Sequence, residues 1–265
     1  MTEATARLSY ASASERRDRL ARAVMEQGYC TIGELSLLFG VSEMTIRRDV
    51  AKLVQESRVR TFHGGVGALS PVDVSGVDYR DRDQRRADAK RSIALRALEP
   101  IRRGAVIGID AGTTAAKLAS LLPTDRQLKV ITPSLPALTS LVSNTGVTIT
   151  SLGGELHAES LSFAGPATLL AISNLHIDTL FLAASGLGER GVFCGNSFDA
   201  ITKRALIDVA DTVVLITDSS KFSTSAMVRV CGWDAIDRLI VDDELAASDE
   251  RMVRQFDVQV ERVTT

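Results

Sequence analysis

Residues 31–66 of this chain read TIGELSLLFGVSEMTIRRDVAKLVQESRVRTFHGGV and predict two short helices followed by a hairpin. Thr31 and Glu34 have the spacing of a capping box, so the first helix is expected to begin beside Thr31. Gly40 is expected to end it, because glycine tolerates the positive φ of a sharp turn. Three apolar residues recur at helical spacing and are expected to be buried: Ile32, Leu35 and Leu38.

The second helix, which Ser42 can cap, is expected to have an apolar face and a cationic face. The apolar face carries Ile46, Val50 and Leu53. At 100° per residue, the outer face carries Met44, Arg48 and Lys52, with Thr45 and Arg47 beside them. Such a helix, held by another across a glycine turn, suits a DNA major groove. A solvated face on an ordinary helical hairpin is the alternative for this segment taken alone.

Residues 58–65, RVRTFHGG, alternate apolar and basic side chains and predict a β-wing lying along a phosphate backbone. Together, TIRRDVAKL and VRTFHGG resemble the winged helix-turn-helix of the DeoR family, bacterial transcriptional regulators of sugar metabolism. That family usually has glycine where Ser57 stands and arginine where Thr61 stands. Both differences would change the wing geometry or weaken a phosphate contact, and neither removes the recognition helix.

Double-stranded operator DNA is therefore the partner expected at this end of the chain. Thr45 and Arg48 would reach base edges, while the other cationic residues would contact phosphates. Two recognition helices about 34 Å apart, in a homodimer or homotetramer, would match one duplex turn. The residues predicted to bind DNA are Ser42, Thr45, Arg47, Arg48, Lys52, Arg58, Arg60 and His63.

The composition is that of a soluble globular protein, with 45% hydrophobic and 24% charged residues among 265. The net charge is −2, but residues 1–70 carry 10 basic and 8 acidic side chains, which is consistent with DNA contact through this end only. No apolar run approaches the ~18 residues of a membrane helix, and no signal core is present, so a cytoplasmic location is expected.

The three cysteines and three histidines lack metal-ligand spacing, so no metal, cofactor or disulfide is expected.

The chain is expected to have three parts. Residues 1–70 form the winged helix-turn-helix domain, residues 71–78 a linker, and residues 79–265 an effector domain. Residues 78–91, DYRDRDQRRADAKR, are dense in both charges and predict a solvated helix. The DeoR resemblance implies a helix here as well, entering the effector domain near Lys90.

Beyond residue 104, short apolar runs alternate with helical stretches. Strands are expected at residues 105–110, 130–132, 147–152, 179–183, 213–217 and 239–241. Helices are expected between them, at residues 115–122, 136–143, 168–172 and 199–210. This alternation predicts an α/β domain with a mostly parallel sheet covered on both faces, and ligands at the carboxyl ends of its strands.

Polar or glycine-rich clusters follow several of these strands. Residues 110–114, DAGTT, lead into a helix whose N-terminal amides can hold an anion. Lys221, in the DSSKF segment, is a mobile cation at another strand end. Each cluster alone can be a simple turn, but their convergence at one sheet edge predicts a pocket for a phosphorylated metabolite. The remaining clusters are residues 132–135, 153–154, 162–165 and 185–188.

GIDAGTT, ITPSL, LGGEL and DSSKF resemble the effector domain of the DeoR family, which is similar to ribose-5-phosphate isomerase and related sugar-phosphate isomerases. The resemblance implies a sugar phosphate as effector, with Asp110 near its hydroxyls. Pro133 stands where the family commonly has asparagine, which removes an amide side chain and a backbone N–H. The residues that the resemblance places around the sugar phosphate are Gly112, Thr113, Thr114, Ser134, Gly153, Gly154 and Lys221.

A sugar-phosphate isomerase is the alternative function. Isomerisation needs a carboxylate that moves a proton beside a carbonyl. Residues 183–189, AASGLGE, correspond to an acid-rich loop of the isomerases, yet only Glu189 is acidic here. No catalytic residue is therefore assigned, and a transcriptional regulator, most simply a repressor of carbohydrate-metabolism genes, is the expected function.

Overall fold

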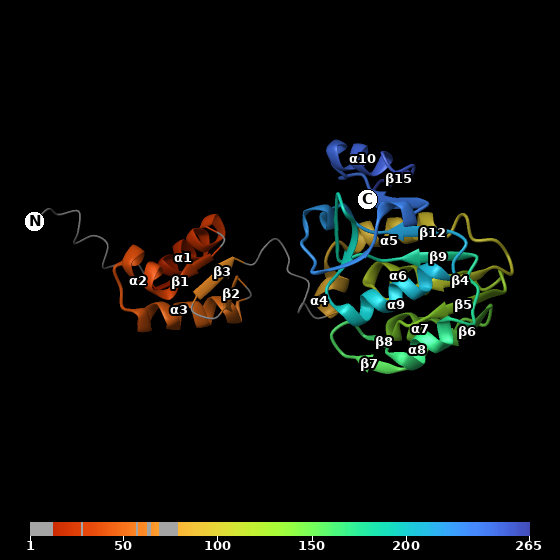
Figure 1. The fold of residues 1–265 in the computed structure, drawn as a ribbon, viewed down its shortest axis with the longest axis horizontal. Coiled ribbons are helices and arrows are strands. Elements are labelled where there is room, and N and C mark those ends of the chain that lie inside the picture. The colour runs from red at the N-terminus through yellow and green to blue at the C-terminus, as the bar shows by residue number, and fades with distance from the viewer. Residues whose placement is uncertain (1–12, 28, 57, 63–64, 69–78) are drawn as a thin grey trace, which may run out of the picture. The chain divides into compact units, whose positions relative to one another are not determined.

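The computed structural model describes residues 13–27, 29–56, 58–62, 65–68 and 79–265 (Figure 1). The chain divides into two compact units, residues 1–72 and 73–265. Ser57, His63 and the expected linker at 71–78 lie outside the described residues, as does the side chain of Arg60. None of the described helices is long and apolar enough to cross a membrane.

The N-terminal unit is a winged helix-turn-helix, as the sequence predicts. Its helices are α1 (Ala13–Gln27), α2 (Ile32–Phe39) and α3 (Glu43–Gln55). A three-stranded antiparallel sheet has the order β1-β3-β2, formed by β1 (Tyr29–Thr31), β3 (Gly65–Ala68) and β2 (Val59–Phe62). The wing is thus confirmed, while strand β1 was not anticipated because three residues carry too little pattern to reveal a strand.

The local signals that define the two helices of the motif are confirmed. Thr31 Oγ1 accepts a hydrogen bond from the Glu34 amide at 3.1 Å, and Glu34 Oε2 accepts one from the Thr31 amide at 2.7 Å. Gly40 ends α2 in the left-handed region, with φ of 61°. Ser42 Oγ accepts a hydrogen bond from the Thr45 amide at 3.3 Å and caps α3. These contacts orient α3 relative to α2.

The core of this unit lies between α1, α2 and α3. Ile46, Val50 and Leu53 are buried in it, as expected, together with Leu35 of α2. The expectation that Leu38 is buried was wrong, because 59% of it is exposed. Leu38 lies three residues after Leu35, so its side chain is rotated by about 60° from that of Leu35 around the helix axis. On the eight-residue α2, this rotation takes Leu38 out of contact with the core.

The larger unit is built on a seven-stranded sheet whose neighbouring strands all run parallel. All six strands expected from the sequence are present, and the α/β prediction is confirmed. In spatial order the strands are β15 (Gln259–Val263), β14 (Arg238–Asp242), β12 (Val213–Ile216), β9 (Thr179–Leu182), β4 (Val106–Ile109), β5 (Leu128–Thr132) and β6 (Val147–Ser151).

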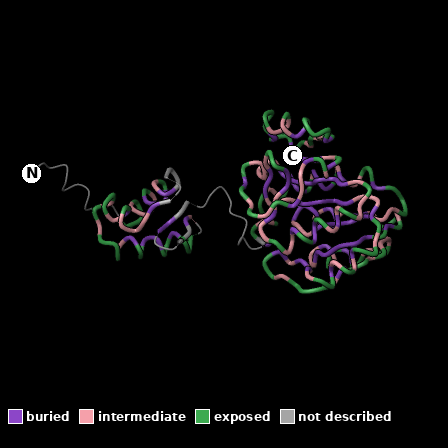
Figure 2. The backbone as a smooth tube through the Cα atoms, in the orientation of Figure 1, coloured by how far each residue is buried: buried purple, intermediate pink, exposed green. Residues whose placement is uncertain are grey.

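Helices cover both faces of this sheet, and Figure 2 shows the buried backbone concentrated along its central strands. One face packs against α5 (Ala87–Ala97), α6 (Thr113–Ser120) and α7 (Leu135–Leu141). The other packs against α8 (Pro166–Ile172), α9 (Ser197–Asp208) and α10 (Ala247–Arg254). Continuous burial such as that of β12, whose four residues are all buried, follows from this double cover.

Two small antiparallel sheets complete the unit. One pairs β7 (Glu155–His157) with β8 (Ser162–Ala164). The other has the order β10-β11-β13, formed by β10 (Gly186–Gly188), β11 (Gly191–Cys194) and β13 (Val228–Cys231). A 3₁₀ turn, Ser219–Ser223, follows β12 and carries Lys221.

The described part of the segment expected to form one solvated helix, residues 79–91, differs from that expectation. It forms α4 (Tyr79–Gln84) and the start of α5, with a break at Arg86, whose φ is 51°. Lys90 is only 3% exposed, because α5 packs on the sheet through Ile93 and Ala94. The dense charges of this segment concealed the apolar stripe that lies further along α5.

Candidate functional site

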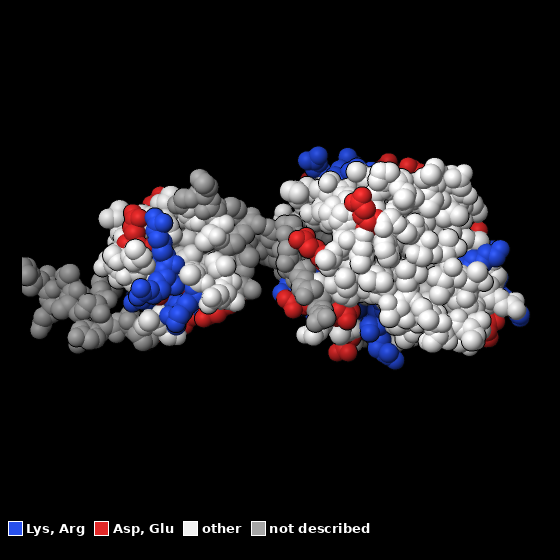
Figure 3. Space-filling model, turned by 90° about the horizontal axis from the view of Figure 1, so that it is seen from below, with Lys and Arg blue, Asp and Glu red and all other residues white. Residues whose placement is uncertain are grey.

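The exposed side of α3 carries the predicted recognition surface. Arg48 and Lys52 are exposed, and so is Met44 at 69%. Figure 3 shows a stripe of basic side chains on one face of the N-terminal unit. Arg47 forms an exposed ion pair with Glu43 at 3.3 Å. The helix therefore has a cationic exposed face, on which the charge of Arg47 is partly neutralised by Glu43.

Other predicted DNA contacts also have intramolecular partners. Ser42 Oγ lies 2.9 Å from Thr45 Oγ1, so both hydroxyls belong to the N-terminal cap of α3. Arg58 donates to Asp18 at 2.7 Å and lies 3.6 Å from Glu56. Arg58 thus joins the start of the wing to α1, with its Nη1 already beside two carboxylates.

An ion pair between a buried carboxylate of α3 and a partly exposed arginine of α1 orients α3. Asp49, 4% exposed, accepts hydrogen bonds from Arg16 Nε at 2.6 Å and Arg16 Nη2 at 3.2 Å. Arg17 lies 3.9 Å from the same carboxylate. Asp49 is buried against α1, while Arg48 and Lys52 stay exposed. Helix α1 therefore packs against α3 without covering the outer face of α3.

A small cavity lies at the carboxyl ends of strands β4, β9 and β12, where the sequence predicts a ligand. The loop after β4 contributes Gly112, Thr113 and Thr114. The segment after β9 contributes Ala183, Ala184 and Ser185, and the turn after β12 contributes Lys221. The loop after β4 also contributes Ala111, and the remaining lining residues are Arg82 of α4, Ser160 before β8, and Asp199 and Lys203 of α9. This set of residues is named the effector cleft.

The N-terminus of α6 opens on the effector cleft. Gly112 precedes the helix and supplies no side-chain cap, so the first backbone amides of α6 lack a capping side chain. A Cβ atom on Gly112 would lie 2.6 Å from the Cβ of Ala183, so the two loops approach as closely as glycine permits. Amides at a helix start, with the hydroxyls of Thr113 and Thr114 beside them, form a binding site suited to an anion.

Three cations surround this site: Arg82, Lys203 and Lys221. Burial lowers the pKa of Lys221, an effect that Asp218 opposes and Arg82 reinforces. An anion placed between Arg82 and Lys221 would relieve their mutual repulsion. The cleft is therefore electrostatically matched to a negative ligand.

Asp110 occupies a position different from the expected contact with sugar hydroxyls. It is 1% exposed, forms an ion pair with Lys203 Nζ, and accepts a hydrogen bond from the Ala183 amide at 2.9 Å. Burial alone would lower the pKa of Lys203, but Asp110 and Asp199 raise it above its ordinary value. Asp110 thus keeps Lys203 charged at the cleft without lining the cleft itself.

Asp199 brings a carboxylate to the lining of the effector cleft, and this carboxylate is already hydrogen-bonded. Ser162 Oγ donates to Asp199 Oδ1 at 2.7 Å, and Asn196 Nδ2 donates to Asp199 Oδ2 at 2.8 Å. Ser160 Oγ lies 2.7 Å from Ser162 Oγ and extends this network to the cleft surface. The network can orient hydroxyl groups of a ligand, which is the chemistry expected of a sugar subsite.

Besides Asp110, three predicted effector residues lie outside the lining of the cleft: Ser134, Gly153 and Gly154. Ser134, 1% exposed, caps α7 by accepting a hydrogen bond from the Ala137 amide at 3.3 Å. Gly153 and Gly154 have positive φ values of 60° and 106°. A Cβ on Gly154 would lie 2.1 Å from Thr168 Oγ1, so this turn packs closely against α8. Their geometry serves the loops behind the cleft.

Sequence reasoning missed four polar residues of the lining: Arg82, Ser160, Asp199 and Lys203. Asp199 and Lys203 are four residues apart on α9, so the two charged side chains lie on the same face of the helix. The apolar residues that identify a helix do not reveal this charged pair. Arg82 was hidden in a charge-rich segment that looks solvated. Tertiary packing, rather than any local motif, brings these residues to the strand ends.

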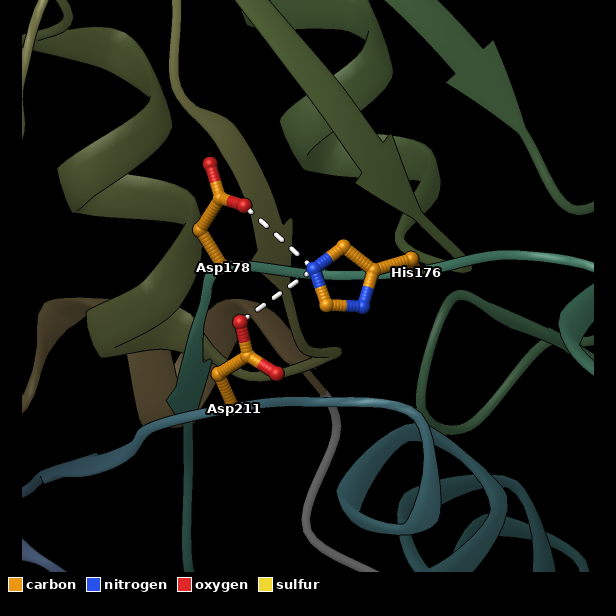
Figure 4. Close-up of side chains that lie close together, drawn as sticks. All are labelled: His176, Asp178 and Asp211. Carbon is orange, nitrogen blue, oxygen red and sulfur yellow. Dashed lines mark ion pairs between the residues drawn. The ribbon is translucent and has the colours of Figure 1, made fainter.

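A separate polar cluster lies near the amino ends of β9 and β12, away from the effector cleft (Figure 4). His176 Nε2 is 3.5 Å from Asp178 Oδ1 and 3.2 Å from Asp211 Oδ2. The three donor atoms lie within 4.8 Å of one another, a spacing that a metal ion would fit. His176 and Asp211 are exposed, and the two distances are those of side-chain contacts at a protein surface.

Known protein families match both units. Residues 16–72 match the DeoR-like helix-turn-helix domain, and residues 85–243 match the DeoR C terminal sensor domain. The chain is 31% identical to a putative aga operon transcriptional repressor of Escherichia coli O157:H7, over 98% of this chain and 97% of the relative. It is 30% identical to the glycerol-3-phosphate regulon repressor of Escherichia coli K12, over 94% of this chain and 98% of that one.

A third relative has the opposite regulatory sign. The L-fucose operon activator of Haemophilus influenzae is 30% identical, over 92% of this chain and 97% of that protein. The matches cover both the helix-turn-helix and the domain that carries the effector cleft, in the same order along the chain. This chain therefore belongs to the DeoR family of transcriptional regulators.

Proposed function

We propose that this DeoR-family protein represses carbohydrate-metabolism genes and that a phosphorylated sugar in the effector cleft changes its affinity for operator DNA. The observation that carries the proposal is the meeting of Thr113, Thr114, Arg82 and Lys221 at the start of α6. Helix amides, hydroxyls and two cations are the groups that proteins use to bind phosphate. One of the relatives is the repressor of a glycerol-3-phosphate regulon, which agrees with a phosphorylated effector.

The sugar part of the effector would lie toward Asp199 and Ser160. These residues join the hydrogen-bond network that also contains Ser162 and Asn196. A carboxylate held in place by two donors still has acceptor capacity for a ligand hydroxyl. The two ends of the cleft thus differ in chemistry, one suited to phosphate and the other to hydroxyl groups.

On the DNA side, α3 would enter the major groove. Arg48 would read base edges, and Lys52 would contact phosphates along with Arg47. A homodimer or homotetramer would present two such helices to a repeated operator sequence. Effector binding must then favour a state with misplaced recognition helices by about 1–3 kcal/mol to be a usable switch.

The isomerase alternative requires a carboxylate that can take a proton from the substrate carbon. In the lining of the cleft, Asp199 is engaged by Ser162 and Asn196. Asp110 is ion-paired with Lys203, and Glu189 is exposed in the turn between β10 and β11. These positions support binding without turnover.

Fluorescence anisotropy with the duplex upstream of this protein's own gene tests the proposal. At fixed salt, the duplex is titrated with protein, with and without a panel of sugar phosphates, and each sample is assayed for turnover. We expect sequence-selective binding that one sugar phosphate weakens several-fold, with no product formed. Turnover of a sugar phosphate without selective DNA binding would establish the isomerase function instead.

A further inference from the structure

We propose that Arg82 binds the phosphate of the effector and, through helix α4, transmits its presence to the DNA-binding unit. This inference rests on the proposed function and adds the residue that couples the two units. It starts from the place of Arg82 in the chain. Helix α4 is the first described element after residues 69–78, which connect it to the winged helix-turn-helix, and Arg82 of α4 lines the effector cleft.

Arg82 links α4 to the far side of the cleft. Its Nη2 donates a hydrogen bond to the Glu159 carbonyl at 3.2 Å, beside Ser160 in the lining. Its guanidinium also lies 5.8 Å from the ring centroid of Tyr79, the first residue of α4, which is 7% exposed. A guanidinium is a planar group of five N–H donors that fits a phosphate in a bidentate manner. An entering phosphate would therefore add strong contacts at the centre of this short helix.

The end of α4 is tied to α5 by a buried lysine. Lys90 Nζ donates hydrogen bonds to the Arg82 carbonyl and, at 2.5 Å, to the Arg85 carbonyl. Lys90 is 3% exposed and belongs to α5, which packs on the sheet. Because Lys90 is hydrogen-bonded to the backbone carbonyl of Arg82, a movement of Arg82 toward a ligand would change the contacts at the α4–α5 junction.

The junction itself is held by Arg86, which lies between the two helices in a left-handed conformation. Its guanidinium pairs with Asp242 at 3.3 Å and with Glu244 at 2.9 Å, and its Nε lies 3.9 Å from Asp218. Asp218 immediately precedes the turn that carries Lys221. The two cations that would bind the phosphate are thus linked, through Asp218 and Arg86, by a short series of contacts.

These contacts define how occupancy would be transmitted. Burial lowers the pKa of Lys221, Asp218 opposes this effect, and the positive charges of Arg82, Arg85 and Arg86 add to it. A phosphate between Arg82 and Lys221 removes the repulsion between the two cations and draws the centre of α4 toward the start of α6. Since α5 is fixed on the sheet, the movement would appear at the beginning of α4, where the connection to the DNA-binding unit starts.

The test separates binding from coupling in the full-length protein. Arg82→Gln is compared with wild type, and Arg91→Gln serves as the matched control, since Arg91 is an exposed arginine on α5. Calorimetry measures the affinity for inorganic phosphate and for the sugar phosphate that most strongly shifts wild-type DNA binding. Anisotropy then measures DNA affinity with that sugar phosphate absent and at saturation.

For Arg82→Gln we expect phosphate affinity to fall about tenfold, as for loss of one charge-assisted contact, and the shift in DNA affinity to be lost even at saturation. Arg91→Gln should retain both. Hydrogen exchange of residues 79–84 should slow on ligand binding in wild type and not in Arg82→Gln.

Each failure has its own meaning. Unchanged phosphate affinity in Arg82→Gln would overturn the assignment of Arg82 as a ligand. Weakened affinity with a full DNA response at saturation would leave Arg82 a role in binding but overturn coupling through α4. A wild-type protein that binds phosphate yet shows no response in DNA affinity would instead overturn the proposed function, and the coupling with it.

Discussion

At the effector cleft, Gly112 occupies a position where a larger residue would collide with a neighbouring loop. Gly112 has an extended φ of 165°, so any residue could adopt its backbone. What forbids a side chain there is steric, because a Cβ at this position would lie 2.6 Å from the Cβ of Ala183. The requirement for glycine therefore comes from a loop far away in the sequence.

We predict that Gly112→Ala separates the loops after β4 and β9 and weakens binding of inorganic phosphate. Overpacking of this kind costs about 1–3 kcal/mol of folding stability. DNA affinity without effector should be unchanged, because the N-terminal unit is untouched. Gly188→Ala is the control, since nothing lies within 4 Å of a Cβ there. Equal loss of phosphate binding in both variants would refute the steric explanation.

At the DNA surface, Arg48 and Lys52 are expected to contribute differently. Loss of a bidentate contact to guanine costs about 1–3 kcal/mol and relaxes sequence preference, which is the result predicted for Arg48→Ala. Lys52→Ala should weaken binding to all sequences alike and reduce the slope of log affinity against log salt by about 1. Anisotropy titrations of operator and scrambled duplexes at several salt concentrations measure both. An Arg48→Ala protein with unaltered sequence preference would show that this residue contacts only the backbone.

At the scale of elements, the sequence predicted a helix or strand correctly where its own residues carry a cap or a regular apolar face. The capping box at Thr31, the left-handed Gly40 and the apolar faces of α3 and β12 all appear in the sequence as they do in the fold. The edge strand β15 and helix α10 were missed. Their sequences, QVERV and ASDERMVR, carry the charges of a surface and too few apolar residues to indicate a core element.

Candidate-site residues were predictable only where a motif follows a strand directly. DAGTT and DSSKF bring Gly112, Thr113, Thr114 and Lys221 to the effector cleft, as expected from the rule for parallel sheets. Arg82 and Lys203 reach the same cleft from helices, and their positions depend on how α4 and α9 pack. No local motif encodes packing of that kind, although the four-residue spacing of Asp199 and Lys203 places both on one face of α9.

Helix α5 supplies a prediction about pH. Burial lowers the pKa of Lys90 from 10.5 to about 8, so the folded state loses its proton at a lower pH than the unfolded state does. The unfolded chain binds more protons between these two values, and stability must rise with pH in that window. Lys90→Met should remove this rise, which amounts to up to about 3 kcal/mol.

Denaturant unfolding of the effector unit between about pH 7.5 and 11 spans this window and measures the effect. Trp233, the single tryptophan of the chain, is 1% exposed in that unit and reports its unfolding by fluorescence. The comparison is between the pH slopes of wild type and Lys90→Met. Parallel slopes would mean that Lys90 keeps its ordinary pKa in the folded protein.

At the scale of the whole molecule, the two units have separable tasks. We predict that Lys221→Ala leaves DNA affinity intact and abolishes the response to sugar phosphate, because the cation lies in the effector cleft. Arg48→Ala should do the reverse and leave metabolite affinity unchanged. Anisotropy and calorimetry on both variants measure the four quantities. A Lys221→Ala protein that loses both activities together would indicate a structural role for this lysine.

The central claim is that one chain couples a phosphate-binding cleft to a DNA-binding helix, and reciprocal linkage tests it most directly. Calorimetric titration of the effective sugar phosphate into the protein, and into its operator complex, gives two affinities. We predict that their ratio equals the ratio of DNA affinities without and with the sugar phosphate, about 5–150-fold for a typical coupling. Equal affinity of the sugar phosphate for the two forms would contradict this claim.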